Sequence, residues 1–217
     1  MDLIEAMRCT PTSRRFTGEP VSAEAIERVL GAARFAPSGG NRQGWRVVVV
    51  REPELKSALA ALYLPRWRAY MEMTGAAAML ADPDAHDERR VRMVRRADEY
   101  AENLADVPVH LVIGVRLADL AVTDADLPRT SIVGGASVYP FVQNVLLALR
   151  SEGLAAAMTT LLVPAEAEVR ELLAIPEDVA LAAHVGVGHP AEPWPKKLAR
   201  RPVGEFAFAE RYGEPLV

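Results

Sequence analysis

Helical spacing of hydrophobic residues is clearest between residues 21 and 35. The apolar side chains there recur three or four positions apart, Ser22 directly precedes the periodic run, and Glu24 follows in what would be the first turn. A serine at that position can accept a hydrogen bond from a free backbone N–H group of the first turn. The pattern therefore predicts a capped helix that ends before the loop of residues 37–41.

Four apolar segments predict extended structure. Residues 45–51 (WRVVVVR) are apolar and β-branched without alternation, which is typical of a strand covered on both faces. Residues 107–115 and 181–188 predict two further strands, and residues 155–163 are expected to be extended.

The segments between these strands predict helices. Residues 53–62 and 164–173 have helical patterns, and residues 84–102 carry five positive and six negative charges around a few apolar positions, which indicates a solvated amphipathic helix. Residues 135–149 predict a helix so apolar that it must be covered nearly all round. Helices that alternate with strands indicate a layered α/β or α+β domain.

Composition narrows the class of protein. The 217 residues fit one domain, residues 1–217, with 50% hydrophobic and 25% charged residues, and the net charge of −4 argues against binding to nucleic acid or to an anionic membrane. The single cysteine cannot close an intrachain disulfide, and the four dispersed histidines make no metal site. Without a signal peptide or a membrane-spanning apolar run, a soluble cytoplasmic protein is expected.

The C-terminal segment, residues 190–217, contains five of the sixteen prolines. It cannot be regular structure throughout, because proline removes a backbone donor. Its apolar residues indicate that it lies along a surface, its own or a partner's; they are Trp194, Phe206, Phe208 and Tyr212.

The H-E-x-x-H, G-x-S-x-G and phosphate-loop motifs are absent from the sequence. Three dispersed segments remain as candidates for binding a ligand. Residues 10–16 crowd three hydroxyls and two guanidiniums together, which suits a phosphate monoester. Residues 36–45 (APSGGNRQGW) combine small residues with two carboxamides, which suits the edge of a flat heteroaromatic ligand. Residues 196–202 hold four cations. Each segment alone is also compatible with an ordinary surface loop or charge run.

In sequence order these segments resemble the FMN-dependent nitroreductase family, and within it the actinobacterial-type NAD(P)H nitroreductases. The resemblance runs from about residue 7 to residue 205 and is most specific in the P-S-x-x-N-x-Q-x-W block. The helix with Gln143 and Asn144, the run Met158-Thr159-Thr160 and the Arg-Arg-Pro-Val tail support it.

The resemblance implies a set of cofactor-binding residues. Thr12 and Arg14, with Ser13 and Arg15 beside them, match the residues that hold the FMN phosphate and the pyrimidine side of the flavin. Asn41, with its neighbours Pro37, Ser38 and Gln43, matches residues that contact the flavin ring. Thr159 and Thr160 match residues near the N5 edge of that ring, and Arg201 matches a cation at the phosphate. Many relatives have another arginine where this chain has Thr10 or Pro11, so the phosphate is expected to be held either with one cation fewer or by Arg8 instead.

The implied fold is of the α+β class: a three-layer α/β/α sandwich with a mixed central sheet, in an interlocked homodimer whose C-terminal arms embrace the partner. FMN would lie at the interface and pass hydride from NADH or NADPH to a nitroaromatic, a quinone or a similar electrophile, without a catalytic side chain. Two alternatives stay open: a flavin-destroying or dehalogenating enzyme on the same scaffold, and a non-catalytic flavin-binding protein.

Overall fold

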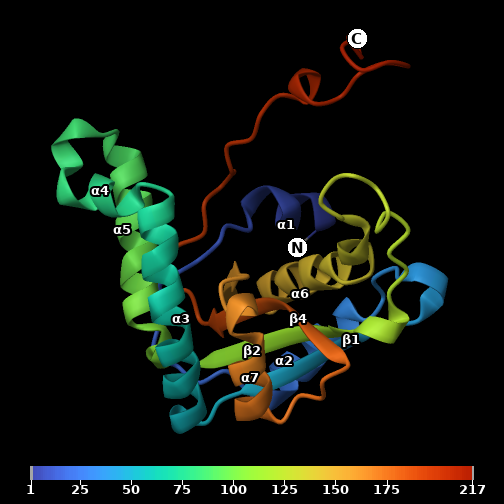
Figure 1. Cartoon of the computed structure of the whole chain (residues 1–217). Coiled ribbons are helices and arrows are strands. Elements are labelled where there is room, and N and C mark those ends of the chain that lie inside the picture. The colour runs from blue at the N-terminus through green and yellow to red at the C-terminus, as the bar shows by residue number, and fades with distance from the viewer. Residues whose placement is uncertain (1, 217) are drawn as a thin grey trace.

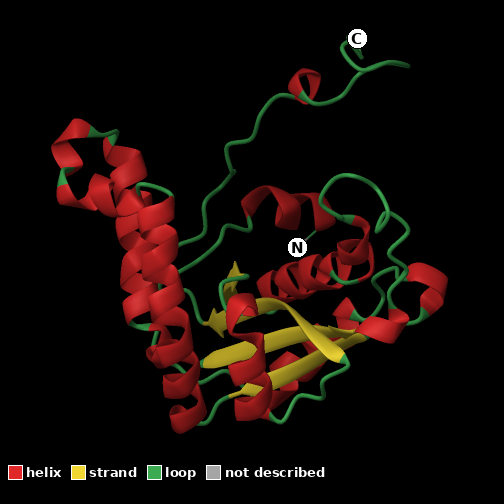
Figure 2. Cartoon of the chain, viewed as in Figure 1, coloured by secondary structure: helices red, strands yellow, loops and turns green. Residues whose placement is uncertain are grey.

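Four strands form one antiparallel sheet in the computed structural model, which describes residues 2–216 (Figures 1 and 2). The strands are β1 (Trp45–Val50), β2 (Val109–Arg116), β3 (Ala155–Thr159) and β4 (Val179–Gly188). Their order across the sheet is β1-β2-β4-β3, so β1 and β3 are the outer strands.

The prediction of a mixed sheet is wrong for the described chain, because all three pairs of neighbouring strands are antiparallel. β2 and β3 do run in the same direction and are joined through a helix, as in a parallel unit. However, β4 lies between them and pairs with both, so no two neighbours are parallel.

Helices cover both faces of the sheet and complete the expected three-layer α/β/α arrangement (Figure 1). One face carries α2 (Ala23–Ala33) and α6 (Tyr139–Ser151), with α1 (Leu3–Cys9) against α6. The other face carries α3 (Pro53–Met73), α5 (Glu88–Glu102) and α7 (Glu166–Leu173), and α4 (Ala76–Ala81) connects α3 to α5.

The alternation of side chains along β2 explains its unbroken apolar sequence. Leu111 and Ile113 belong to the core under α2 and α6, whereas Val112 belongs to the core under α3 and α5. β1 differs from the prediction of a strand covered on both faces. It has one neighbour only, so Arg46 is exposed and the valines after it are only half-buried except the last, Val50.

The helix predicted over residues 53–62 continues eleven residues further, to Met73, through Pro65. Proline inside a helix removes one backbone hydrogen bond and disfavours continuation. Here Tyr63, Trp67 and Met71 follow one another at four-residue spacing and are all buried. Their burial on both sides of the proline outweighs the lost bond, and this tertiary effect is not visible in the local pattern.

Other predicted elements exist with shifted ends. α2 is capped as expected, since the Ser22 hydroxyl accepts from the Ala25 N–H at 3.1 Å. α6 begins only at Tyr139, after a 3₁₀ turn, because Pro140 favours the first helical turn. β3 ends at Thr159 and α7 begins at Glu166, with a 3₁₀ turn between them. α1, which the pattern did not predict, is capped by the Asp2 carboxylate.

The C-terminal segment leaves the body of the protein after Leu198, whose N–H donates to the Arg8 carbonyl at 2.8 Å (Figure 1). From residue 199 to residue 216, the hydrogen bonds found in the described chain lie within the segment itself. Phe206 and Tyr212 are exposed there. Likewise Leu146 and Leu147 of α6 are only half-buried, so α6 is not covered all round within this chain.

Two of the four histidines form a buried pair between β2 and β4. The rings of His110 and His184 are stacked with centroids 5.0 Å apart, and Nδ1 of His110 lies 2.7 Å from Nε2 of His184. Burial lowers the pKa of His110 to about 2 and that of His184 to about 4, so both rings are neutral near pH 7. The two histidines, far apart in the sequence, are thus neighbours within the buried part of the sheet.

Within residues 2–216 no helix is long and apolar enough to cross a membrane, and no group of three or more possible metal-ligating side chains occurs.

Gly186 of β4 allows the Tyr100 side chain to approach the sheet, because a Cβ atom there would collide with the Tyr100 hydroxyl. We expect Gly186→Ala to lower the free energy of unfolding by about 1–3 kcal/mol, the range for an overpacked core. The buried hydroxyl has no hydrogen-bond partner in the described chain, so adding Tyr100→Phe should recover part of the loss. Urea denaturation measures both effects. Gly18→Ala, where nothing lies within 4 Å, is the matched control; an equal loss at both glycines would contradict the prediction.

Candidate functional site

The N-terminal segment of residues 10–16 runs along the outer edge of β3. The Ser13 N–H donates to the Ala156 carbonyl at 2.8 Å, and the Thr17 N–H donates to the His189 carbonyl at 2.9 Å. The Arg15 carbonyl accepts from the Ala191 N–H, so Phe16 pairs with Pro190, just after β4. These backbone bonds fix the four candidate side chains from Thr12 to Arg15 in the wall of a large cavity.

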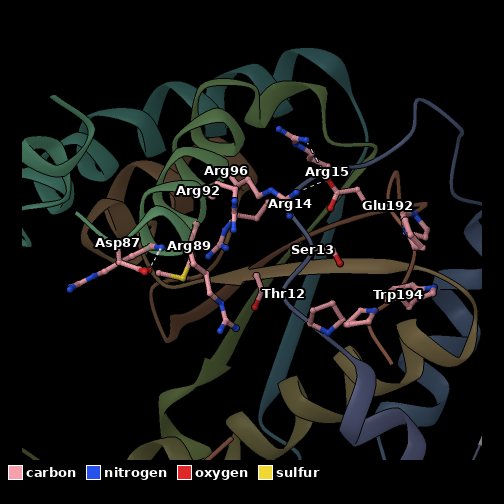
Figure 3. Close-up of a pocket in the computed structure, with 16 residues that line it drawn as sticks. Thr12, Ser13, Arg14, Arg15, Asp87, Arg89, Arg92, Arg96, Glu192 and Trp194 are labelled. Atoms are coloured by element: carbon pink, nitrogen blue, oxygen red, sulfur yellow. Dashed lines mark hydrogen bonds and ion pairs between the residues drawn. The ribbon is translucent and has the colours of Figure 1, made fainter. Parts of the chain in front are cut away.

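The large cavity has a volume of about 760 Å³. Its lining residues come from the N-terminal segment, from α5 and from the start of the C-terminal segment (Figure 3). Arginines from α5 face Thr12 and Arg14 across the hollow, and Glu192 and Trp194 lie on the third side. Hydroxyls of the N-terminal segment and guanidiniums of both facing walls thus line one cavity, and this combination of groups suits a phosphate.

The arginines of this cavity differ in their charge balance. Arg15 lies 2.7 Å from Glu99 and 3.3 Å from Glu192, and the hydrogen bond and charge of Glu99 raise the pKa of Arg15. Arg96 shares Glu192 at 3.0 Å. No carboxylate of residues 2–216 forms an ion pair with Arg14. Arg14 is therefore the free cation of the N-terminal segment.

A second cavity of about 310 Å³ adjoins Arg14 and is lined by aromatic rings. Thr159 and Thr160 at the end of β3 line it opposite Tyr63, Trp67 and Tyr70 of α3. Burial raises the pKa of the Tyr63 phenol. The indole N–H of Trp67 donates to the Asp98 carboxylate at 2.8 Å, which fixes that ring.

Arg14 lines both cavities and so connects a cationic space with an aromatic one. The structure thereby brings together six predicted site residues: Thr12, Ser13, Arg14, Arg15, Thr159 and Thr160.

The predicted carboxamide loop lies elsewhere in the chain. It precedes β1, at the opposite edge of the sheet from β3, and none of its four candidates lines either cavity. Pro37, Ser38, Asn41 and Gln43 therefore do not join the other candidates within one chain.

The backbone of this loop is strained at the two carboxamides. Asn41 and Gln43 have φ of 54° and 50°, in the left-handed region, and the amide of Gln43 donates to the Asn41 side-chain oxygen at 3.2 Å. The Ser38 hydroxyl accepts from the Gln43 N–H, and the Ser137 hydroxyl accepts from the Gly39 N–H, both at 3.0 Å.

Asp124, which sequence reasoning missed, organises the segment that carries Ser137. Its buried carboxylate accepts from the Ile132 N–H at 3.0 Å and from Ser131 and Arg129 at 2.7 Å each. These bonds, above all the one from Ile132, lower the pKa of Asp124 to about 2. The clustered polar residues between 123 and 131 were the only available signal.

Arg201 lies in the C-terminal segment beyond Leu198, and 84% of its side chain is exposed. Its nearest partner is Glu205, at 3.9 Å, and it does not line either cavity of its own described chain. Like the carboxamide loop, it is not brought to the other candidates.

The α5 arginines are the other contributors that sequence reasoning missed. Mixed charge signs favoured a solvated helix, and α5 does bury Val91 and Tyr100 on its apolar side. The spacing of Arg89, Arg92 and Arg96 at i, i+3 and i+7 nevertheless places them on one face, and that face lines the large cavity.

Comparisons with known proteins identify the family of the chain. The model of the nitroreductase family matches residues 8–189. Similar curated proteins include an NADH dehydrogenase of Thermus thermophilus, 30% identical over 184 residues and 82% of each chain. Another is a putative NADH dehydrogenase/NAD(P)H nitroreductase of Methanothermobacter thermautotrophicus, 25% identical over 88% of this chain and 79% of that protein. Among solved structures, iodotyrosine deiodinase bound to FMN and 3-iodo-L-tyrosine has a TM-score of 0.69 at 23% identity, covering 97% and 98% of the two chains.

The low pKa of Asp124 predicts a pH-dependent contribution to stability. Its folded-state pKa lies below the ordinary value of about 3.9, so the contribution is present above that value and is lost as the pH falls towards 2. We expect Asp124→Asn to melt at a lower temperature than the parent protein at neutral pH, with a difference that narrows between about pH 4 and pH 2. Asp126→Asn, an exposed change in the same segment, is the control. A difference independent of pH would argue against the role of this carboxylate.

Proposed function

The chain belongs to the nitroreductase family and is an oxidoreductase, and we propose that it uses FMN to pass electrons from NADH or NADPH to an electrophilic aromatic acceptor such as a nitroaromatic or a quinone. The observation that carries the proposal is the position of Arg14 between the cationic and the aromatic cavity. A molecule with a phosphate at one end and a flat ring system at the other matches this pair of spaces.

The residues present fit FMN on both counts. Thr12 and Arg14 offer a hydroxyl and an unpaired guanidinium for the phosphate. Thr159 and Thr160, with the rings across the second cavity, offer a polar edge and apolar walls for the isoalloxazine. When bound, FMN supplies the two-electron transfer, which explains why the site needs no nucleophilic side chain. Arg14 would stabilise negative charge that develops on the pyrimidine side of the reduced ring.

We propose that the carboxamide loop and Arg201 act in the site of a partner subunit, in a homodimer. Two observations support this. The loop lies across the full width of the sheet from Arg14, and Arg201 stands on a segment that leads away from its own body. The half-buried leucines of α6 and the exposed Phe206 and Tyr212 provide apolar surface for such an association.

The acceptor site is proposed to be tolerant of different flat rings. The second cavity is the space proposed for the flavin ring, and an acceptor reduced by that ring would lie flat against it, so stacking would contribute more to acceptor binding than any single polar contact. Donor and acceptor would then use the same space in turn, and the first product must leave before the second substrate binds.

The absorption spectrum of the purified protein under argon tests this function. A flavin band should bleach on addition of NADH or NADPH and return on addition of a nitroaromatic or a quinone. Steady-state double-reciprocal plots should be parallel, because the two reactants bind alternately. A flavin band that neither nucleotide bleaches would identify a flavin-binding protein without this activity, and loss of flavin or of halide from the reactants under oxygen would identify the alternative enzymes.

The shared site predicts complementation between two damaged chains. Arg14→Ala and Arg201→Ala homodimers should each bind FMN about 1.5–3 kcal/mol more weakly, because each loses a hydrogen bond to a charged group. A heterodimer of the two chains, purified through two different affinity tags, should keep one tight site, since one of its sites contains both arginines.

Flavin content after gel filtration measures the result, and Lys196→Ala serves as the control because it changes a cation that lines neither cavity. A heterodimer as poor in flavin as its parents would place both arginines in one chain's site and refute the partner contribution.

A further inference from the structure

The large cavity contains more arginines than an FMN phosphate needs. Two come from the N-terminal segment, Arg14 and Arg15, and four come from α5. These four are Arg89, Arg90, Arg92 and Arg96, called here the arginine face of α5. Figure 3 shows Arg89 and Arg92 extending from α5 towards the N-terminal segment, from the opposite wall.

The carboxylates nearby neutralise only part of this charge. Glu99 and Glu192 pair with Arg15 and Arg96, and Arg92 pairs with Glu88, one helical turn earlier and largely exposed. An exposed ion pair of that kind contributes little to stability, so Arg92 remains available to bind an anion in the cavity. Within residues 2–216, Arg89 and Arg90 form no ion pair through their side chains.

Crowded like charges repel one another unless an anion lies between them. The residual positive charge of the cavity therefore lies on two opposite walls, at Arg14 on one side and at Arg89, Arg90 and Arg92 on the other.

The Asp87 carboxylate also lines the cavity, where it accepts from the Arg90 N–H at 2.9 Å and forms no ion pair with an arginine of the described chain. The apolar part of the lining is mostly rigid. The C-terminal segment contributes Pro190, Pro193, Pro195 and the ring of Trp194, the N-terminal segment contributes Pro11, and α5 contributes Met93. Trp194 is itself fixed, because the guanidinium of Arg150 lies 3.9 Å from the centre of its ring. Proline walls and a mobile thioether suit a flat organic group better than a bare inorganic ion.

We propose that the arginine face of α5 binds an anionic group of the reacting molecule, either the acidic substituent of an aromatic acceptor or the 2′-phosphate of NADPH. This rests on the proposed function and adds the class of reactant: an aromatic or heteroaromatic anion, carboxylate or phosphate, instead of a neutral ring. Arg14 on the opposite wall holds the flavin phosphate, so the two anions use separate cations. Because α5 is solvated on its outer side, the selection for charge should weaken as the salt concentration rises.

Binding and turnover of matched reactants test the proposal. The probes are 4-nitrobenzoate against the neutral isostere 4-nitrobenzamide, and NADPH against NADH, titrated by calorimetry and then assayed with the flavin-loaded protein. The variants are Arg89→Gln and Arg92→Gln, with Arg95→Gln as the control, since Arg95 is exposed on the same helix and does not line the cavity. Flavin content is measured in each preparation.

We expect the parent protein to bind 4-nitrobenzoate or NADPH about 10-fold more tightly than its matched counterpart, because a charge-assisted hydrogen bond provides a ratio of dissociation constants of that size. Arg89→Gln and Arg92→Gln should bring that ratio close to one at unchanged flavin content, whereas Arg95→Gln should keep it. Loss of the benzoate preference identifies the acceptor as the anion, and loss of the NADPH preference identifies the donor.

Three results would overturn the assignment: no preference for either anion in the parent protein, ratios that the two variants leave unchanged, or release of flavin from Arg89→Gln and Arg92→Gln. The last would mean that α5 holds the flavin phosphate. Because the titrations do not require turnover, failure of the flavin to bleach would refute the proposed function while the calorimetric ratio still decides this proposal.

Discussion

The hydrogen bond from the Ser13 N–H to the Ala156 carbonyl fixes the N-terminal segment as an added edge beside β3, and the candidate site depends on it. Side chains alternate along an extended segment, so this register decides the direction of Arg14 relative to its neighbours. Arg15 points to Glu99 and Glu192, whereas Arg14 lines the junction of the two cavities. Adjacent arginines thus have different roles: Arg15 ties the segment to α5 and to the C-terminal segment, and Arg14 remains free for a ligand.

The same ion pairs position the walls of the large cavity. Glu192 binds Arg15 and Arg96 together, and so joins the N-terminal segment, the C-terminal segment and α5 at one point. Exposed ion pairs contribute little to stability singly, but a shared carboxylate also restricts how far α5 can move from β3. The cavity therefore keeps its shape while its remaining arginines stay available for binding, which is what a preformed site for an anion requires.

Local sequence patterns predicted those elements whose determinants are local. The helix after Ser22 and the strands around Leu111 and Val185 follow from periodicity, a cap and apolar runs. The passage of α3 through Pro65 could not be predicted, because it depends on burial against other elements. For the site, the residue types of positions 12–15 were enough to mark them as candidates for binding a phosphate. Their closeness to Thr159 could not be read from the sequence, because it depends on the order of the strands in the sheet. The sequence did not reveal which face of α5 lines the cavity, because positive and negative residues are nearly equal in number along the helix. Which arginines remain unpaired depends on the carboxylates that lie near them in the folded chain.

Backbone strain gives independent support to the role of the carboxamide loop. Asn41 and Gln43 both have positive φ, and a non-glycine residue in that region costs on the order of 1–3 kcal/mol in the strained case, although asparagine tolerates it better than most. Such a conformation persists only where the surroundings enforce it. Here Ser38 and Ser137 each hold a backbone N–H group of the loop, and Asp124 fixes the segment that carries Ser137. The two carboxamides are exposed, so these bonds do not serve to pack the side chains of Asn41 and Gln43 into the chain's own core. The serine bonds to the backbone, and the bond from the Gln43 amide to the Asn41 side-chain oxygen, restrict the orientation of the two exposed amides, as the proposed recognition of a flat ligand on a neighbouring subunit would need.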